Sequence, residues 1–197
     1  MLIDVTESGD HFTVKVHRPS TRYFDDFLSL NCKELLLRLA VFPNAKEITE
    51  SLGAYKAAKQ LLPSVIELGN PNRAAVIVAD GSTPRTGAVF ALRTRWAVAS
   101  IDPQLVDKPI YRAVDRLTIY PCRVEDVHLR YEVPVIIVAV HSHASLRAAV
   151  EAVTAPSRAV VAMGCCVPQD LDLAPDAEYP DWGIWSPKRI IKLWKSV

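Results

Sequence analysis

The chain has 197 residues, of which half are hydrophobic and 23% are charged, and its 23 basic and 22 acidic residues leave a formal net charge of +1. These proportions exclude collagen-like, low-complexity and strongly disordered chains, and the balanced charge predicts no charge-driven partner, although a local basic patch would still allow nucleic-acid binding. The length suits one domain with a sizeable core, so we expect residues 1–197 to form a single domain.

The first 70 residues are expected to form an N-terminal strand and a helical cover. Residues 11–17 alternate polar and apolar side chains, which is typical of an edge strand half exposed to water. Ser20 or Thr21 can cap a helix through residues 21–39, where apolar side chains recur every three or four positions. A second helix is predicted over residues 45–62, before a proline and a turn.

The sequence also bears on the cellular compartment. No apolar run reaches the length of a signal peptide or the roughly 20 residues of a membrane span, so we expect a cytoplasmic protein with no membrane partner. Four cysteines are too few and too irregularly spaced for a disulfide scaffold, and a bond between the neighbours Cys165 and Cys166 would be strained. We therefore expect reduced thiols. The sequence predicts no oligomeric state.

Five short apolar runs, separated by segments long enough for helices, follow residue 71. Runs that are apolar on both faces are typical of buried parallel strands joined by crossover helices. A sixth run, residues 189–194, predicts a last strand. The fold class is therefore α/β, a doubly wound and mostly parallel sheet with flanking helices, in which residues 71–197 form a Rossmann-like core. The five runs span residues 74–79, 96–101, 117–120, 133–140 and 158–163.

Ligands of such sheets bind outside the carboxyl ends of the strands, so the residues after each run are candidate contacts. The first run leads into a loop with two glycines and small hydroxyl residues, and a helix is expected to begin near its end. Glycine lets the backbone approach a ligand, and a helix N-terminus favours negative charge. Known phosphate-binding fingerprints are absent, so an ordinary strand-to-helix turn is the alternative. The candidates are Asp80, Gly81, Ser82, Thr83 and Gly87.

Acidic residues follow the second and third runs. Asp102 comes after Asp80 at the interval of about 20 residues at which nucleotide-binding folds place the acid that binds ribose hydroxyls. The alternative is a turn aspartate before Pro103. Glu125 and Asp126 follow the third run, where either could accept from an adenine amino group or be a solvated loop acid.

Histidines and cysteines follow the fourth and fifth runs. His141 and His143 come after the fourth run, and Cys165 and Cys166 come after the fifth. Because these strands are expected to be neighbours, the four side chains should gather on one rim of the sheet. A zinc site and a cysteine nucleophile with a histidine base are two interpretations. We favour a third interpretation, without a metal, in which the cysteines are small buried hydrophobic residues and the histidines are polar strand-end residues or contact substrate.

The order of these landmarks resembles that of the class I S-adenosylmethionine-dependent methyltransferases, over about residues 71–166. The resemblance implies S-adenosylmethionine as the cofactor, with the glycine-bearing loop around its methionine part, Asp102 at the ribose and Glu125 or Asp126 near the adenine. Residues 141–143 stand where the family carries a substrate-facing motif. The implied cofactor contacts are Asp80, Gly81, Ser82, Thr83, Gly87, Asp102, Glu125 and Asp126.

Methyl transfer mainly requires an aligned nucleophile and, where needed, removal of a proton, for which His141 or His143 is the candidate base. RNA or a protein is the expected acceptor. For RNA, phosphate contacts could come from Arg85, Lys188 and Arg189, and base stacking from Trp182 and Trp185.

Two other functions stay open. In the resembling family the loop glycines are closely spaced, whereas residues 83–86 separate Gly81 from Gly87 here. This difference motivates a non-catalytic binding or scaffold protein as the alternative. A nicotinamide-dependent oxidoreductase ranks last, because the dinucleotide fingerprint is missing.

Overall fold

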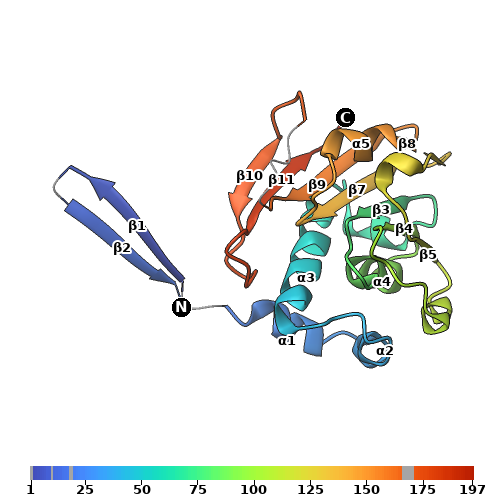
Figure 1. Ribbon diagram of the computed structural model, residues 1–197, viewed down its shortest axis with the longest axis horizontal. Helices are drawn as coiled ribbons and strands as arrows, with labels where there is room; N and C mark the ends of the chain where they lie inside the picture. Colours follow the sequence, from blue (N-terminus) through green and yellow to red (C-terminus); the bar gives the residue numbers. More distant parts are fainter. Residues whose placement is uncertain (1, 10, 18–19, 166–170) are drawn as a thin grey trace.

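The computed structural model describes residues 2–9, 11–17, 20–165 and 171–197. Its centre is a seven-stranded sheet made of β3 (Ala74–Val78), β4 (Ala97–Ile101), β5 (Leu117–Tyr120), β7 (Val135–Val140), β9 (Arg158–Met163), β10 (Ala177–Pro180) and β11 (Ile190–Trp194). The strands lie in the order β10-β11-β9-β7-β3-β4-β5 (Figure 1). The five strands from β9 to β5 are parallel, whereas β11 runs antiparallel to both β9 and β10.

The predicted strands are confirmed, with bounds that differ by at most two residues. β3, β7 and most of β9 are buried on both faces, which is why they appear in the sequence as unbroken apolar runs. The sequence did not predict β10, whose four residues alternate between half-buried and exposed at the edge of the sheet.

Helices cover both faces of the sheet. On one face α3 (Ala45–Gln60) and α4 (Arg85–Arg93) pack in a large apolar core with side chains such as Ile77 and Val138. On the other face α5 (Leu146–Glu151) packs over Val76 and Ile137. The short parallel pair β6 (Leu129–Arg130) and β8 (Val153–Thr154) and three 3-10 helices, η1 (Val65–Gly69), η2 (Pro109–Ala113) and η3 (Val124–Asp126), complete the connections.

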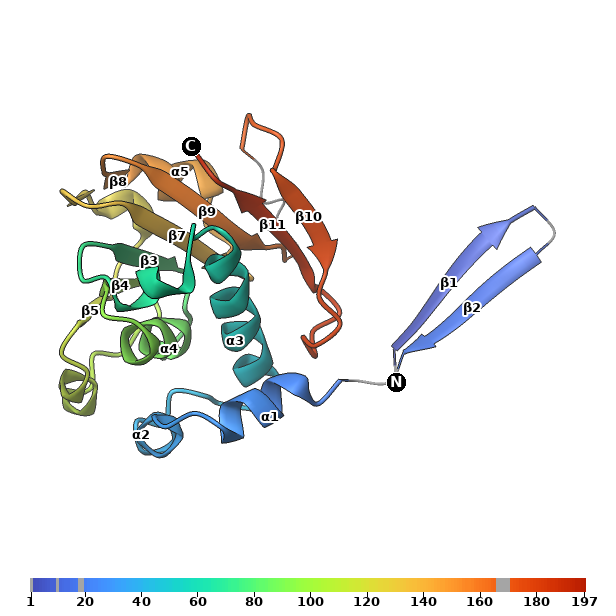
Figure 2. The same ribbon diagram turned by 180° about the vertical axis from the view of Figure 1, so that it is seen from behind.

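The N-terminal part differs from the sequence prediction in two respects. Residues 11–17 do form a strand, β2 (His11–His17), but it pairs with an unpredicted β1 (Leu2–Ser8) in a separate hairpin that projects from the rest of the chain (Figure 2). The single helix expected over residues 21–39 is two short ones, α1 (Arg22–Leu28) and α2 (Lys33–Arg38). At the C-terminus of α1 the Ser29 hydroxyl donates to the carbonyl of Asp26 at 2.6 Å.

The second predicted helix is α3, which ends at Gln60, two residues before the expected end. Its N-terminus is capped by the Asn44 side chain, which accepts from the backbone N–H of Glu47 at 3.2 Å. This cap fixes where the first turns of α3 lie, and those turns contribute to the site described below. None of the helices in the described ranges is both long and apolar enough to cross a membrane.

Candidate functional site

A cavity of about 600 Å³ opens at the carboxyl ends of β3, β4, β5 and β7. This is the crevice where the order of the strands reverses, with β4 and β7 on opposite sides of the first parallel strand, β3. The volume lies within the range of about 300–1,000 Å³ of small-molecule sites. The cavity is lined by residues that follow each strand, among them Gly81, Arg85, Asp102, Gln104, Glu125, His141 and His143.

The buried side chain of Asp80 holds the loop after β3 in place through hydrogen bonds. Its carboxylate is buried and accepts three hydrogen bonds of 2.8 Å, from the backbone N–H groups of Thr86 and Gly87 and from the hydroxyl of Ser100. Burial raises the pKa of Asp80, against the opposing effects of Arg85 and of these donors. Because the side chain ties the first turn of α4 to β4, Asp80 shapes the loop but does not line the cavity.

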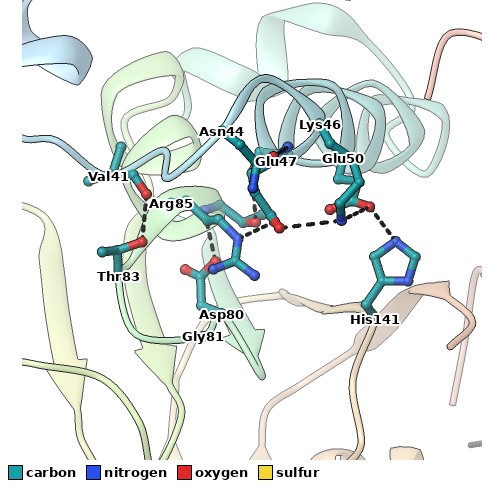
Figure 3. Close-up of polar contacts among 12 residues, drawn as sticks. Val41, Asn44, Lys46, Glu47, Glu50, Asp80, Gly81, Thr83, Arg85 and His141 are labelled. Atoms are coloured by element: carbon teal, nitrogen blue, oxygen red, sulfur yellow. Dashed lines mark hydrogen bonds and ion pairs between the residues drawn. The ribbon is translucent and has the colours of Figure 1, made fainter. Parts of the chain in front are cut away.

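Gly81 and Arg85 form the wall of the cavity above this loop. Gly81 has φ of +79°, a backbone conformation that favours glycine, and the Arg85 guanidinium lies directly where a Cβ atom would be. The Nε of Arg85 lies 2.7 Å from Oε2 of Glu47 at the start of α3 (Figure 3). A helix that precedes β3 in the chain thus holds a positive charge at this end of the cavity.

Asp102 is the acid after β4. It is 8% exposed and lines the cavity, and its two oxygens accept from the backbone N–H of Gly81 at 2.9 Å and of Gln104 at 2.7 Å. A carboxylate has about four acceptor positions. The Asp102 carboxylate therefore fixes two loops and retains capacity to accept from hydroxyl groups of a ligand.

The other predicted cofactor contacts divide in two. Glu125 lines the cavity, but Ser82, Thr83, Gly87 and Asp126 do not. Thr83 donates to the carbonyl of Val41 at 2.5 Å, and the added Cβ of Gly87 would press on Ser100 and Asp80. Of the predicted cofactor residues, the structure brings Gly81, Asp102 and Glu125 together around the cavity.

His141 faces α3 from the end of β7. Its φ of +51° is unusual for a residue with a side chain, and its backbone N–H donates to the carbonyl of Met163 at 3.0 Å. The ring Nε2 lies 2.7 Å from Oε1 of Glu50, and Lys46 Nζ lies 2.8 Å from the same oxygen (Figure 3). Burial alone would raise the pKa of Glu50, but His141 and Lys46 outweigh it and lower that pKa to about 2.

His143 and Cys165 meet on the same rim, as the sequence predicts for neighbouring strands. The His143 Nε2 lies 3.3 Å from the Cys165 Sγ. Cys32 and Cys122 are free thiols, and Cys166 lies outside the described residues. In the part of the chain that the structure describes, no group of three or more potential metal ligands comes together.

The residues expected to contact RNA lie mostly on the segment before β11. Arg189 is buried, with its guanidinium 4.4 Å from the centre of the Trp182 ring. Trp185 is half exposed, donates from its indole to the carbonyl of Ser20 at 2.9 Å and packs edge-on against a phenylalanine. Lys188 is exposed.

Sequence reasoning gave no cofactor role to Arg85 and missed Glu47 and Glu50 altogether. The two acids lie more than 20 residues before the nearest strand of the cavity, β3, and only the cap at Asn44 marks where their helix begins. No local pattern indicates that this first turn meets the strand ends.

No family model and no curated protein matches the sequence. Among solved structures, the chain is similar to a mutant of MtNAS in complex with S-adenosylmethionine, with a TM-score of 0.50 and 12% identity over 88% of this chain and 70% of that chain. It also matches a second structure of that mutant (TM-score 0.45, 14% identity, 87% and 73% covered) and a DhpI–SAH complex (TM-score 0.36, 12% identity, 78% and 82% covered). The first match and the sheet topology confirm the predicted Rossmann-like α/β fold.

Proposed function

We propose that this protein is an S-adenosylmethionine-dependent methyltransferase that binds its cofactor in the cavity at the carboxyl ends of the strands. The observation that carries the proposal is the Asp102 carboxylate, which lines a cavity of suitable size at the point where nucleotide-binding folds place a ribose-binding acid. The likeness of the fold to MtNAS, whose structure contains S-adenosylmethionine, supports the same choice of cofactor.

The residues around the cavity fit the parts of this cofactor. Asp102 would accept from the ribose hydroxyls, and Glu125 would lie near the adenine amino group. Gly81 leaves room for the amino-acid end, and the Arg85 guanidinium could pair with its carboxylate through a charge-assisted fork. When bound, S-adenosylmethionine supplies a methyl carbon on a positively charged sulfur, which leaves with the electron pair of the broken bond.

The protein's own contribution is to align the acceptor and to take up its proton. His141 and His143 both line the cavity, and a histidine can accept a proton near neutral pH. The first turns of α3 are joined by ion pairs to Arg85 and His141, two of the residues that line the cavity.

Isothermal titration with S-adenosylhomocysteine, the demethylated product, tests cofactor binding. We expect saturable binding that Asp102→Ala weakens by about 10- to 100-fold, the loss expected for hydrogen bonds to a charged acceptor. Asp115→Ala is the matched control, because this exposed acid precedes β5 at the opposite end of the strand. Absence of binding by the wild-type protein, or an equal loss in both variants, would contradict the proposal. In the first case the non-catalytic scaffold becomes the better account.

We also propose RNA as the methyl acceptor. The support is a loop that carries the partly exposed Trp182 and the exposed Lys188, because aromatic rings and cations together bind single-stranded bases and phosphates; the buried Arg189 packs against the Trp182 ring. Incubation with S-adenosylmethionine that carries a labelled methyl group should label RNA, and Lys188→Ala should weaken RNA binding without changing the affinity for S-adenosylhomocysteine. Label found only in protein would contradict RNA as the acceptor.

A further inference from the structure

Glu50 is a buried carboxylate that has no assigned role so far. It belongs to the second turn of α3, is 1% exposed, and its Oε1 contacts both Lys46 Nζ at 2.8 Å and His141 Nε2 at 2.7 Å. Burying a carboxylate costs free energy unless it is paired, so these two partners explain how the protein tolerates it. One of those partners lines the cavity.

The contact determines which nitrogen of His141 carries hydrogen. The Nε2–H bond of His141 would not point along the short line to Oε1 of Glu50. The contact is therefore an ion pair and not a linear hydrogen bond. Even without alignment, an ionised oxygen at 2.7 Å repels the electron density of an unprotonated Nε2 and attracts the partial positive charge of a protonated one. The hydrogen of the neutral ring is therefore favoured on Nε2, and the lone pair on Nδ1.

The second ring nitrogen is directed away from Glu50 (Figure 3). Among the residues that the structure describes, no hydrogen bond to His141 Nδ1 is present, and the residue lines the cavity. The left-handed backbone of His141, tied to β9 through Met163, sets this orientation of the ring. A carboxylate behind the ring with the other nitrogen unoccupied is the arrangement by which a histidine is prepared to accept a proton.

The charges of the cluster leave room for that proton. Lys46 and Arg85 are positive, and Glu47 and Glu50 are negative and pair with them at 2.7 to 3.3 Å. The cluster is therefore neutral when His141 is neutral. Uptake of one proton gives an imidazolium directly beside the Glu50 carboxylate, which stabilises the new charge.

His143, the other candidate base, has a different environment. Its Nε2 contacts the thiol of Cys165 at 3.3 Å, and sulfur is a weaker hydrogen-bonding partner than a carboxylate. A thiol contact stabilises an imidazolium less than the ionised Glu50 does. The geometry therefore distinguishes the two histidines that the sequence leaves equivalent.

We propose that Glu50 is a positioning residue that presents Nδ1 of His141 as the proton acceptor, and that the methyl acceptor is consequently a hydroxyl or an amine. This inference rests on the proposed methyltransferase function. An acceptor oxygen or nitrogen that receives the methyl carbon forms the new bond with one of its lone pairs and must lose one proton, which Nδ1 takes. A carboxylate acceptor arrives without that proton and would need no such pair.

Ring-nitrogen NMR of the ¹⁵N-labelled protein tests the assignment without cofactor or acceptor. At a pH well above the ordinary histidine pKa of about 6.5, we expect hydrogen on Nε2 and a lone pair on Nδ1 of His141, whose signals are identified by their loss in His141→Asn. Glu50→Gln should shift the ring towards a mixture of both forms. Glu34→Gln, the same change at an exposed acid on α2, is the matched control and should leave the His141 signals unchanged.

The outcomes separate this inference from the proposed function. Hydrogen on Nδ1 in the wild-type protein overturns the role of Glu50, even if S-adenosylhomocysteine binds. This result comes from the wild-type spectrum alone and does not depend on the folding of a variant. Unchanged His141 signals in a folded Glu50→Gln protein overturn it as well. The expected signals together with absent S-adenosylhomocysteine binding would refute the methyltransferase, and with it the acceptor class, while leaving the Glu50–His141 arrangement as a structural feature.

Discussion

Replacing Asp80 with alanine should destabilise the whole domain, although the residue stands where a cofactor contact was expected. The carboxylate is 2% exposed and accepts 2.8 Å hydrogen bonds from Thr86, Gly87 and Ser100. The alanine variant would leave two N–H groups of the first turn of α4 and one hydroxyl without an acceptor. The variant therefore loses the hydrogen bonds that join β3, β4 and α4.

Leaving a buried donor without its partner costs about 1–3 kcal/mol, and removing one side of a buried charged cluster costs about 3–5 kcal/mol. Relief of the buried carboxylate offsets part of the summed cost of three donors, so we expect a loss of about 3–5 kcal/mol for Asp80→Ala. For a chain of this length that corresponds to a fall in Tm of roughly 6–20 °C. Stability of typical domains is about 5–15 kcal/mol, so the variant should still fold at low temperature.

Urea unfolding followed by circular dichroism measures this loss. Ser100→Ala is the matched control, because it removes only one of the three hydrogen bonds and should cost about 1 kcal/mol. If Asp80→Ala costs no more free energy of unfolding than Ser100→Ala, the carboxylate does not organise the loop. A stable Asp80→Ala protein that no longer binds S-adenosylhomocysteine would instead make Asp80 a direct cofactor contact.

Three further measurements concern separate parts of the structure. The pKa of Glu50 is lowered from 4.5 to about 2, so its ion pairs stabilise the folded state by about 3 kcal/mol above pH 4.5. This stabilisation is lost as the pH falls from 4.5 towards 2. Glu50→Gln should therefore have a lower free energy of unfolding than wild type in urea at pH 7, and this difference should shrink at pH 3. A difference that stays constant contradicts the pairing. Arg85→Ala should weaken S-adenosylhomocysteine binding about tenfold or more in titration, and unchanged affinity would remove Arg85 from the site. Gly53→Ala places a Cβ 2.7 Å from the Ile184 side chain and should cost about 1–3 kcal/mol in thermal unfolding, whereas Gly69→Ala, with nothing within 4 Å, should change stability by less than about 1 kcal/mol; equal effects would contradict the close packing of α3.

The parallel strands could be predicted because burial on both faces leaves a direct mark on the sequence. β7 is apolar at all six positions, and only a buried strand or a buried helix segment has that pattern. β10 has no such apolar run, since its residues alternate at a sheet edge. The break between α1 and α2 interrupts a periodic apolar pattern that by itself predicts one helix. The sequence also does not encode the reversed direction of β11 in any local motif.

The site was predictable only as far as the ends of the strands. The rule that ligands bind at the carboxyl ends of the strands places Gly81, Asp102 and Glu125 around the cavity. It does not say whether an acid after a strand lines the cavity or bonds the backbone of its own loop, as Asp80 does. The acids of α3 reach the site through tertiary packing, so neither their spacing nor their composition indicates it. The positive φ of His141 likewise has no signal in the sequence, because histidine is not a residue that requires it.

A crystal structure with S-adenosylhomocysteine bound tests the central claim most directly. The account predicts the ligand in the cavity at the carboxyl ends of β3, β4 and β7, with its ribose hydroxyls within hydrogen-bond distance of the Asp102 carboxylate and its amino-acid end against Gly81 and Arg85. A ligand that occupies another part of the surface, or one that lies in the cavity without contact to Asp102, would contradict the account.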